Sequence, residues 1–268
     1  MTIKIIVAGP RGKMGSETIR MLQHEDTLQL VACIDRKNDG KTLKDVNGQP
    51  ALNVPIYENP LECFQQHADA DVLIDLTVPD AGYVHTKTAL ENHIRPVVGT
   101  SGFTNDQISA LSKLSTETKT GCIIAPNFAV GAVLMMQFAK MAAKFFPDVE
   151  IIEKHHDQKL DAPSGSAIKT AQLIKGTRKK KQQGHPNEEE TIKGSRGANV
   201  DDMRIHSVRL PGLIAHQEVI FGGAGQTLTI KHDSISRDSF MDGIKFAVQQ
   251  VMKLDKLIYG LENVLDME

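Results

Sequence analysis

The stretch Ile3-Lys4-Ile5-Ile6-Val7-Ala8-Gly9-Pro10-Arg11-Gly12-Lys13-Met14-Gly15 decides the fold of the chain. Its apolar first half is typical of a buried strand, and a helical pattern begins near Met14. The glycines between them match Gly-x-x-Gly-x-x-Gly, which allows a tight turn and the close approach of a pyrophosphate to a helix start. The stretch therefore predicts a dinucleotide-binding loop. A helix-starting turn with chance glycines is the alternative.

Strands and helices alternate through the first half of the chain. Apolar runs predict the strands, helical periodicity predicts the helices, and Gly or Pro separates them. Thr104 is suited to cap one of these helices. Strands are expected at 3–8, 30–34, 71–77, 96–99 and 122–125, and helices at 14–23, 81–92 and 105–118. Such alternation predicts a doubly wound, parallel α/β sheet with helices on both faces.

Strand patterns dominate the second half. An apolar helix is expected over 128–146, with Gln137, Lys140 and Lys144 forming its one hydrated stripe. Further strands are expected at 149–154, 204–210, 218–221 and 227–232, the last two joined by a glycine-rich hairpin. This order predicts an α+β domain with an open antiparallel or mixed sheet.

Two other segments complete the second half. The polar segment 175–199 holds a basic run at 178–181 and three consecutive glutamates, so a solvated, mobile excursion is favoured over contact with phosphate. The segment 238–254 predicts an amphipathic helix with Ser236 as N-cap. This helix is expected to return and pack on the first domain.

Size, charge and composition narrow the class of protein. The 268 residues allow one large or two small domains, and a net charge of −2 offers no basic field for nucleic acid. No apolar stretch approaches the roughly 20 residues of a membrane span, and no signal peptide precedes the first strand. Cys33, Cys63 and Cys122 lie far apart, which favours buried reduced thiols. A soluble cytoplasmic protein is expected.

Asp35 ends the second predicted strand, and Arg36 and Lys37 follow it. An acidic residue at this position accepts hydrogen bonds from the ribose hydroxyls of NAD, whereas an arginine accommodates the 2′-phosphate of NADP. Because both types stand side by side, we expect use of NADPH and NADH, with Arg36, Lys37 and Lys13 as phosphate ligands. An ordinary charged loop is the alternative.

Two further strand ends carry turn residues, Gly99-Thr100-Ser101-Gly102 and Ala125-Pro126-Asn127-Phe128. Ligands of a doubly wound sheet lie beyond the carboxyl ends of its strands, so both segments should meet the nicotinamide half of the cofactor. Asn127 is suited to hydrogen-bond a carboxamide or a ribose.

The segment 153–167 (Glu-Lys-His-His-Asp-Gln-Lys-Leu-Asp-Ala-Pro-Ser-Gly-Ser-Ala) joins a predicted strand to a predicted helix. His155, His156 and Lys159 are able to exchange protons, and the helix start offers N–H groups to a substrate carboxylate. No metal is expected, because no neighbouring pattern completes a ligand set. A buried structural histidine is the other alternative, and acid–base chemistry beside a nicotinamide is the favoured interpretation.

The segment 153–167 closely resembles the signature of the 4-hydroxy-tetrahydrodipicolinate reductase family, enzymes of the diaminopimelate route to lysine. The resemblance spans nearly the whole chain. It includes the glycine loop, the two strand-end segments, and Ser207-Val208-Arg209-Leu210-Pro211-Gly212 followed by His216-Gln217-Glu218. The family usually has threonine where this chain has Ser101 and Ser166, and serine keeps the hydroxyl.

The resemblance implies NAD(P)H-dependent reduction of 4-hydroxy-tetrahydrodipicolinate to tetrahydrodipicolinate with loss of water. It implies a dinucleotide-binding domain over 1–127 and 237–268, and a substrate-binding domain over 128–236 whose open sheet builds a homotetramer. It assigns His155 as proton donor and acceptor, Lys159 as proton donor, and His156, Gly165 and Ser166 to the substrate carboxylates. It assigns the cofactor to Gly9, Pro10, Arg11, Gly12, Lys13, Met14, Asp35, Arg36, Gly99, Thr100, Ser101, Ala125, Pro126, Asn127 and Phe128.

Two other functions stay open at this point. A homoserine or aspartate-semialdehyde type of oxidoreductase is one, although the latter needs a catalytic cysteine and none lies near 125–160. A dinucleotide-sensing regulator is the other, and it would not need His155 and Lys159 together. Arg209 and His216 are expected to be structural rather than to touch substrate. Because the two half-sites lie in different predicted domains, domain closure is expected during turnover.

Overall fold

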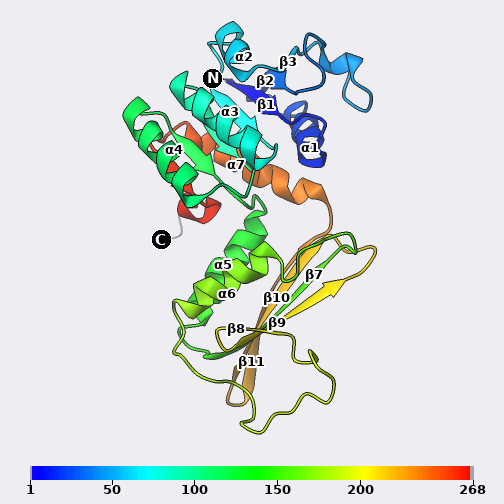
Figure 1. The fold of residues 1–268 in the computed structure, drawn as a ribbon, viewed down its shortest axis with the longest axis vertical. Helices are drawn as coiled ribbons and strands as arrows, with labels where there is room; N and C mark the ends of the chain where they lie inside the picture. Colours follow the sequence, from blue (N-terminus) through cyan, green and yellow to red (C-terminus); the bar gives the residue numbers. More distant parts are fainter. Residues whose placement is uncertain (1, 266–268) are drawn as a thin grey trace. The chain divides into compact units, whose positions relative to one another are not determined.

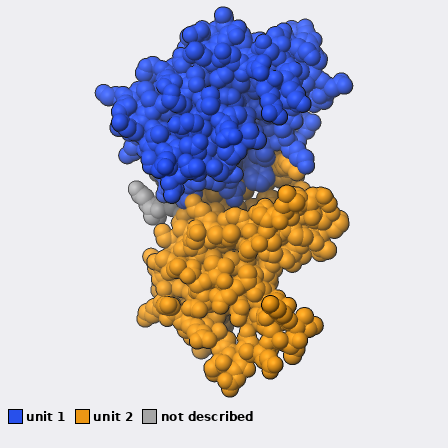
Figure 2. Space-filling model, in the orientation of Figure 1, with its two compact units in different colours: residues 1–128, 240–268 blue, residues 129–239 orange. Residues whose placement is uncertain are grey.

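The computed structural model describes residues 2–265. Its internal contacts divide the chain into two compact units, which Figure 2 colours separately. Unit 1 comprises residues 1–128 and 240–268, and unit 2 comprises residues 129–239. The boundaries predicted from the sequence were 127/128 and 236/237, and the ligand roles given to the two domains stay predictions.

Unit 1 is built on a seven-stranded sheet in which all neighbouring strands are parallel. Its order is β12-β6-β5-β4-β1-β2-β3. The strands are β1 (Ile3–Ala8), β2 (Leu28–Ile34), β3 (Ile56–Tyr57), β4 (Val72–Asp75), β5 (Arg95–Val98), β6 (Cys122–Ile124) and β12 (Leu257–Tyr259). From β1 the chain runs to β2 and β3, and then crosses to β4 on the other side of β1. The β1/β4 boundary is therefore the switch point at which such sheets bind ligands, and the Rossmann-like prediction is confirmed.

Helices flank this sheet in two groups (Figure 1). The helices α2, α3 and α4 pack in a row, whereas α1 packs against α7. Their bounds are α1 (Lys13–Leu22), α2 (Pro60–Gln66), α3 (Pro79–Glu91), α4 (Asn105–Thr118) and α7 (Met241–Val251), with short 3-10 turns at Leu43–Asp45, Arg237–Phe240 and Leu261–Asn263. Thr104 caps α4 as predicted, because its hydroxyl accepts the N–H of Gln107 at 3.2 Å.

The start of α7 differs from the prediction. Ser236 does not cap it, because the 3-10 turn Arg237–Phe240 intervenes and Phe240 occupies the N-cap. The hydroxyl of Ser236 instead accepts the N–H of Asp238 at 3.2 Å. The helix itself belongs to unit 1, where it contacts α1, β5 and β6.

Unit 2 is built on a five-stranded sheet with the order β11-β10-β7-β9-β8. Its elements are β7 (Asp148–His155), β8 (Ala198–Val200), β9 (Met203–Arg209), β10 (Ala215–Gly223), β11 (Gln226–Ser234), α5 (Val130–Ala142) and α6 (Gly165–Lys175). The pair β7/β9 is parallel and the other pairs are antiparallel, so the sheet is mixed, as predicted. The glycine-rich hairpin joins β10 to β11.

Alternate residues of β7 point to the buried face of this sheet. Val149, Ile151 and Glu153 are buried, whereas the alternate residues Ile152 and Lys154 are half-buried. Figure 1 shows α5 and α6 together on one side of the sheet. The carboxylate of Glu153 therefore lies in the interior of unit 2, two residues before the last residue of β7.

The exposed stripe of α5 differs from the one predicted. Phe138 and Met141 are exposed on it beside Lys140, and Phe145, which follows the helix, is 77% exposed. The stripe is thus partly apolar, whereas the sequence predicted only polar residues there. Across the described residues, every helix is too short or too polar to span a lipid bilayer.

The polar segment 175–199 also differs from its prediction. Arg178 is only 8% exposed, and its guanidinium donates to the carbonyls of Pro147 (2.9 Å) and Asp201 (2.7 Å). The side chain of Gln183 bonds both the N–H and the carbonyl of Val149, at 3.0 and 2.9 Å. The prediction of a solvated excursion is wrong at these residues, because backbone groups beside β7 need buried partners.

The cysteines agree with the prediction. Cys33, Cys63 and Cys122 are free and buried. Burial raises the pKa of the Cys63 thiol to about 12, so the thiol stays protonated at neutral pH.

Candidate active site

The glycine loop joins the end of β1 to the start of α1. Gly9 has φ +83°, and a Cβ there would lie 2.8 Å from the carbonyl oxygen of Leu76. A Cβ at Gly15 would overlap the carbonyl oxygen of Gly9, so glycine is required for α1 to approach the loop. Gly12 is the N-cap, and no side chain caps the helix. The first turn of α1 thus leaves N–H groups that could hold an anion such as the pyrophosphate of a dinucleotide.

Asp35 lies one residue beyond the end of β2. Arg11 of the glycine loop donates to both of its carboxylate oxygens, one of them at 2.8 Å, and Asn38 donates at 2.8 Å. Burial tends to raise the pKa of Asp35, but the bonds from Arg11 and Asn38 outweigh it and lower the pKa. The side chain of Arg36, by contrast, is exposed. The basic partner of Asp35 is therefore Arg11, which the sequence assigned only as a member of the loop.

A second buried carboxylate joins the loops that follow β4 and β5. Asp75 is 0% exposed, and its Oδ1 accepts the hydroxyls of Thr77 (2.8 Å) and Thr100 (2.6 Å). Its Oδ2 lies 2.7 Å from Nδ1 of His85 on α3. The hydroxyl of Thr100 also accepts the N–H of Thr77 at 3.0 Å. Asp75 thus sets the conformation of two loops beside the switch point.

The remaining residues predicted for the cofactor divide into buried and accessible groups. Gly99 packs closely on Leu76 and Phe128, since a Cβ there would lie 2.8 Å from each side chain. The buried members offer little side-chain surface to a ligand, and the hydroxyl of Thr100 is engaged by Asp75 and Thr77. The buried members are Pro10, Thr100, Ala125 and Phe128, and the exposed or half-buried ones are Gly12, Lys13, Met14, Ser101, Pro126 and Asn127. All of them follow the carboxyl ends of β1, β5 and β6.

Unit 2 holds its own buried carboxylate, Glu153, close to the end of β7. Its Oε2 lies 2.5 Å from Nδ1 of His155 and accepts Nη1 of Arg209 at 3.0 Å. Its Oε1 accepts Nη2 of Arg209 at 2.8 Å and the backbone N–H of Ser164 at 3.2 Å. Burial tends to raise the pKa of Glu153, but the hydrogen bonds from His155, Arg209 and Ser207 lower it to about 2. The carboxylate is therefore ionised at neutral pH.

Lys159 lies in the loop that joins β7 to α6. Its ammonium group pairs with Asp161 at 2.7 Å. This ion pair and Arg209 lower the pKa of Asp161. Nη2 of Arg209 also donates to the backbone carbonyl of Asp161 at 2.6 Å. One guanidinium thus contacts both the carboxylate that holds His155 and the residue that holds Lys159.

The N-terminus of α6 follows this loop. Ser164 is the N-cap, and its hydroxyl accepts the N–H of Ala167 at 3.3 Å. A Cβ at Gly165 would meet nothing within 4 Å, and the hydroxyl of Ser166 lies 3.2 Å from that of Ser164. The first turn therefore has open space and hydroxyl groups beside its N–H groups, as a carboxylate site requires. Half-buried His156 precedes the loop, and its carbonyl accepts the N–H of Lys159 at 3.2 Å.

His216 is held within the strands. Its Nδ1 lies 2.7 Å from Asp233, and its Nε2 accepts the N–H of Ile214 at 3.3 Å. Both ring nitrogens have partners from the protein, which agrees with the expected structural role. Arg209, also expected to be structural, contacts the residues that hold both proposed proton carriers.

Sequence reasoning gave no role to Asp75 or Glu153. The signal for Glu153 was present, because residues two apart on a strand share a face and His155 lies two residues on. Asp75 is the last residue of a buried strand at the switch point, which is also a usable signal. The partners His85 and Arg209 come from other elements and carried no such local signal.

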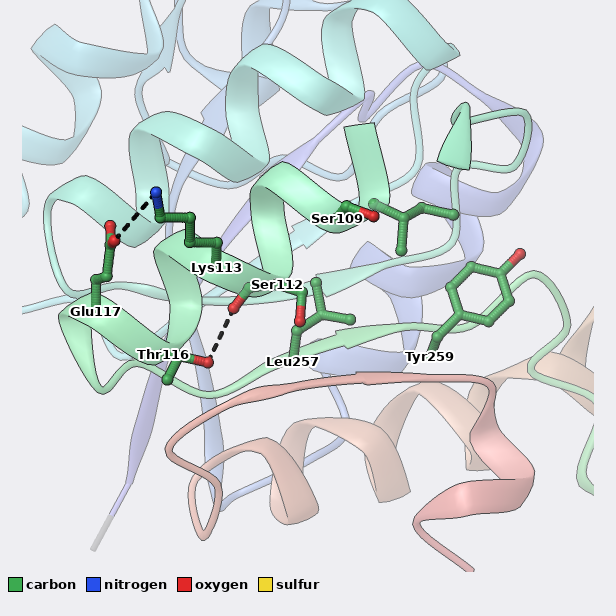
Figure 3. A pocket seen from close by; sticks show the side chains of 8 residues that line it. Ser109, Ser112, Lys113, Thr116, Glu117, Leu257 and Tyr259 are labelled. Atoms are coloured by element: carbon green, nitrogen blue, oxygen red, sulfur yellow. Dashed lines mark hydrogen bonds and ion pairs between the residues drawn. The ribbon is translucent and has the colours of Figure 1, made fainter. Parts of the chain in front are cut away.

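A separate hollow lies between α4 and β12 (Figure 3). Ser109, Ser112 and Tyr259 line it, together with the ion pair of Lys113 and Glu117 at 3.8 Å. None of the residues predicted for cofactor or substrate borders it. The hollow is therefore separate from the two half-sites described above.

Comparison with known proteins adds a second line of observation. Two family models match, "Dihydrodipicolinate reductase, N-terminus" over residues 3–128 and "Dihydrodipicolinate reductase, C-terminus" over residues 131–265. The 4-hydroxy-tetrahydrodipicolinate reductases of Oceanobacillus iheyensis and Geobacillus kaustophilus are 64% and 60% identical, each over 99% of this chain and 100% of the relative. The solved structure of a dipicolinate-bound dihydrodipicolinate reductase from Paenisporosarcina sp. TG-14 is 53% identical and covers 99% of this chain and 100% of its own, with a TM-score of 0.90.

Proposed function

The chain belongs to the dihydrodipicolinate reductase family, and from this premise we propose that it reduces 4-hydroxy-tetrahydrodipicolinate to tetrahydrodipicolinate with loss of water. Membership makes it a nicotinamide-dependent oxidoreductase of the diaminopimelate route to lysine. The observation that carries the proposal lies in unit 2. Glu153 contacts both His155, a proton carrier, and the N-cap of α6, an anion site.

The substrate is proposed to bind in unit 2 through its carboxylates. The first turn of α6, at Gly165 and Ser166, offers N–H groups and a hydroxyl to one carboxylate, and His156 is proposed to contact the substrate as well. A related protein is described as dipicolinate-bound, and dipicolinate carries the same two carboxylates. The chain's serine at 166 keeps the hydroxyl that this contact needs.

His155 and Lys159 are proposed to manage protons. A bound nicotinamide cofactor would supply the hydride. Nε2 of His155 exchanges a proton, since Nδ1 is engaged by Glu153. Lys159 donates from its ammonium group once it exchanges Asp161 for the substrate. Replacement of the 4-hydroxyl group by hydride releases the oxygen as water and consumes one proton in all, which these two side chains are suited to provide.

The cofactor is proposed to be NADPH or NADH. The uncapped first turn of α1 and the glycines of the loop fit a pyrophosphate. Asp35 is suited to accept the ribose hydroxyls of NADH. Arg11, which bonds Asp35 here, is suited to turn to the 2′-phosphate of NADPH. The same ion pair of Arg11 and Asp35 would then serve both cofactors, with Asp35 binding NADH and Arg11 binding NADPH.

The chain is further proposed to form a homotetramer in the cytoplasm. The sheet face of unit 2 opposite α5 and α6 carries half-buried Ile152 and Ile220 beside the ion pair of Lys154 and Glu218. This mixture of apolar side chains and paired charges suits contact between copies. Light scattering after size exclusion tests the proposal, and a monomeric mass would contradict it.

The activity is tested in two separate measurements. A fluorescence titration gives the affinity for NADPH and NADH. Absorbance at the NADPH band then follows oxidation with freshly made substrate. Oxidation that depends on the substrate supports the proposal. Cofactor binding without oxidation would instead favour a dinucleotide-sensing regulator.

A further inference from the structure

Glu153 is distinct from the proposed proton carriers in its complete burial. Its side chain is 0% exposed, whereas that of His155 is 12% exposed and that of Lys159 is 23% exposed. It therefore has no surface to offer a substrate. Its two oxygens accept four hydrogen bonds from N–H donors of β7, β9 and the start of α6, and the side chain of Ser207 also bonds it. A group with these contacts acts through its neighbours.

The contact with His155 fixes which ring nitrogen carries a permanent proton. An ionised carboxylate only accepts hydrogen bonds, so Nδ1 of His155 must donate to Oε2, 2.5 Å away. Nδ1 therefore stays protonated in both charge states of the ring. Only Nε2 gains and loses a proton, and the bond also sets the direction in which Nε2 points.

Arg209 keeps Glu153 in this acceptor role. Its two terminal nitrogens bond one oxygen each, at 3.0 and 2.8 Å, so the guanidinium engages the carboxylate in a bidentate manner. It supplies a permanent positive charge while the charge of His155 changes. The low pKa of Glu153 agrees with this arrangement.

We infer that Glu153 is a positioning residue of the reaction, which fixes the Nδ1–H tautomer of His155 and the first turn of α6 through one carboxylate. The inference rests on the proposed function, because it concerns the proton carrier of that reaction. It extends that function by coupling the orientation of the proton carrier to that of the carboxylate site.

Replacement of Glu153 by glutamine isolates this role. Each carboxylate oxygen faces two N–H donors, so the NH2 group of a glutamine meets donors whichever way it turns. Turned towards His155, it forces Nδ1 to accept and moves the proton to Nε2. Turned towards Ser164, it removes the bond that holds α6. Either arrangement disturbs one of the two functions that we assign.

Glu150 offers a matched control on the same strand. It accepts Nη2 of Arg196 at 2.6 Å and lies 2.8 Å from Nε2 of His206, so it too pairs with one arginine and one histidine. These partners also lower its pKa, against the opposing effect of burial. Glu150 contacts neither His155 nor α6 in these bonds. Glu150→Gln removes an equivalent charge without touching the proposed site.

The first measurement uses the parent protein alone. Histidine-selective 15N NMR reports which ring nitrogen is protonated, and the spectrum of His155→Asn identifies the signals of His155. We expect a protonated Nδ1 and an unprotonated Nε2 in the neutral ring. A neutral ring protonated at Nε2 overturns the inference, whether or not any Glu153 variant folds.

The second measurement compares steady-state kinetics. Glu153→Gln should lower kcat about 10- to 100-fold, because general acid–base catalysis contributes about 10²- to 10⁴-fold and misorientation forfeits part of it. Its Kd for NADPH should equal that of the parent, and Glu150→Gln should keep the parent's kcat within about twofold, as a matched control far from the chemistry should. If the parent is active and Glu153→Gln has the same kcat, the inference is wrong but the proposed function stands. A parent that never oxidises NADPH with this substrate overturns the proposed function, and the inference with it.

Discussion

Asp75 in unit 1 and Glu153 in unit 2 invite direct comparison. Each is a fully buried carboxylate at or near the C-terminal end of a strand inside its sheet. Each lies close to Nδ1 of a histidine, at 2.7 Å for Asp75 and 2.5 Å for Glu153. They differ in their other partners. The hydroxyls of Thr77 and Thr100 hold Asp75, whereas a bidentate guanidinium, that of Arg209, holds Glu153.

The difference matches what each carboxylate organises. Asp75 shapes two loops that are proposed to bind a cofactor, and two hydroxyl groups hold it in place of a guanidinium. Glu153 stands beside a histidine that is proposed to change its charge. A permanent cation keeps Glu153 compensated in both states of that ring. Changes in unit 2 should therefore reduce kcat, and changes in unit 1 should weaken cofactor binding.

The largest expected effect is a loss of kcat when the proposed proton carriers of unit 2 are removed. His155→Ala and Lys159→Ala should each lower kcat about 10²- to 10⁴-fold, because each removes a proposed proton carrier. The Kd for NADPH, measured by fluorescence, should not change, because the proposed cofactor loops lie in unit 1. If both variants turn over at the parent rate, the roles assigned to these residues are wrong.

The next largest effect tests how much the guanidinium of Arg209, which bonds Glu153, stabilises the fold. Arg209→Met should lower the free energy of unfolding by about 3 kcal/mol, because it leaves a buried charge without its partner. Urea denaturation measures this loss. Arg196→Met removes the partner of the more exposed Glu150 and should cost no more than about 1 kcal/mol. If both variants lose the same free energy of unfolding, burial does not make the pair of Arg209 and Glu153 more stabilising than that of Arg196 and Glu150.

Acid should weaken the same cluster. The folded pKa of Glu153, about 2, is depressed below its ordinary value of 4.5, so its ionised form stabilises the fold above pH 4.5. That contribution, about 3 kcal/mol, should be lost as the pH falls from 4.5 towards 2. The difference in unfolding free energy between parent and Glu153→Gln should shrink over this range. A constant difference down to pH 2 would contradict the low pKa.

A smaller effect is expected in unit 1. Asp75→Asn should raise the Kd for NADPH about tenfold, which corresponds to about 1.4 kcal/mol, because an amide cannot accept from every donor that now faces Asp75. At saturating cofactor, kcat should fall much less. Asp71→Asn is the control, because Asp71 accepts the N–H of Lys4 at 2.9 Å just before β4, at the other end of that strand. Similar Kd values in both variants would refute the proposed role of Asp75.

The smallest effect concerns the choice of cofactor. Arg11→Ala should lower kcat/KM for NADPH about fivefold relative to NADH, because exposed ion pairs contribute up to about 1 kcal/mol. The freed carboxylate of Asp35 would also repel a 2′-phosphate. Arg36→Ala is the comparison, since the side chain of Arg36 is exposed. If Arg36→Ala lowers kcat/KM for NADPH more than Arg11→Ala does, Arg36 rather than Arg11 contacts the 2′-phosphate, as the sequence predicted.

The sequence predicted unit 1 well because its strands are buried apolar runs that end at Gly, Pro or Asp. The helix α2 was missed although Asn59 and Pro60 gave a usable start signal, since the amide oxygen of Asn59 accepts the N–H of Leu61 at 2.9 Å. The strand β12 was missed for a different reason. Its three residues form a strand only by pairing with β6, a contact that no local pattern encodes.

The sequence alone offers the proposed reactive residues of the site, but not the residues that hold them. The spacing of His155, Lys159 and the start of α6 lies within one segment and could be read directly. The contacts of Arg209 with Glu153 and Asp161 depend on β9 lying beside β7, which the sequence pattern could not establish. The ion pair of Arg11 with Asp35 likewise depends on the turn of the glycine loop.

β12 follows unit 2 in the sequence, and this order determines when each unit can fold on the ribosome. Unit 2 is one continuous segment, so all of it has been synthesised before α7 and β12 exist. Unit 1 must wait for both, with the edge of β6 unpaired until Leu257–Tyr259 arrive. An unpaired strand edge is a template for other chains. The β6 edge of the nascent protein is therefore open to pairing with other chains until β12 covers it.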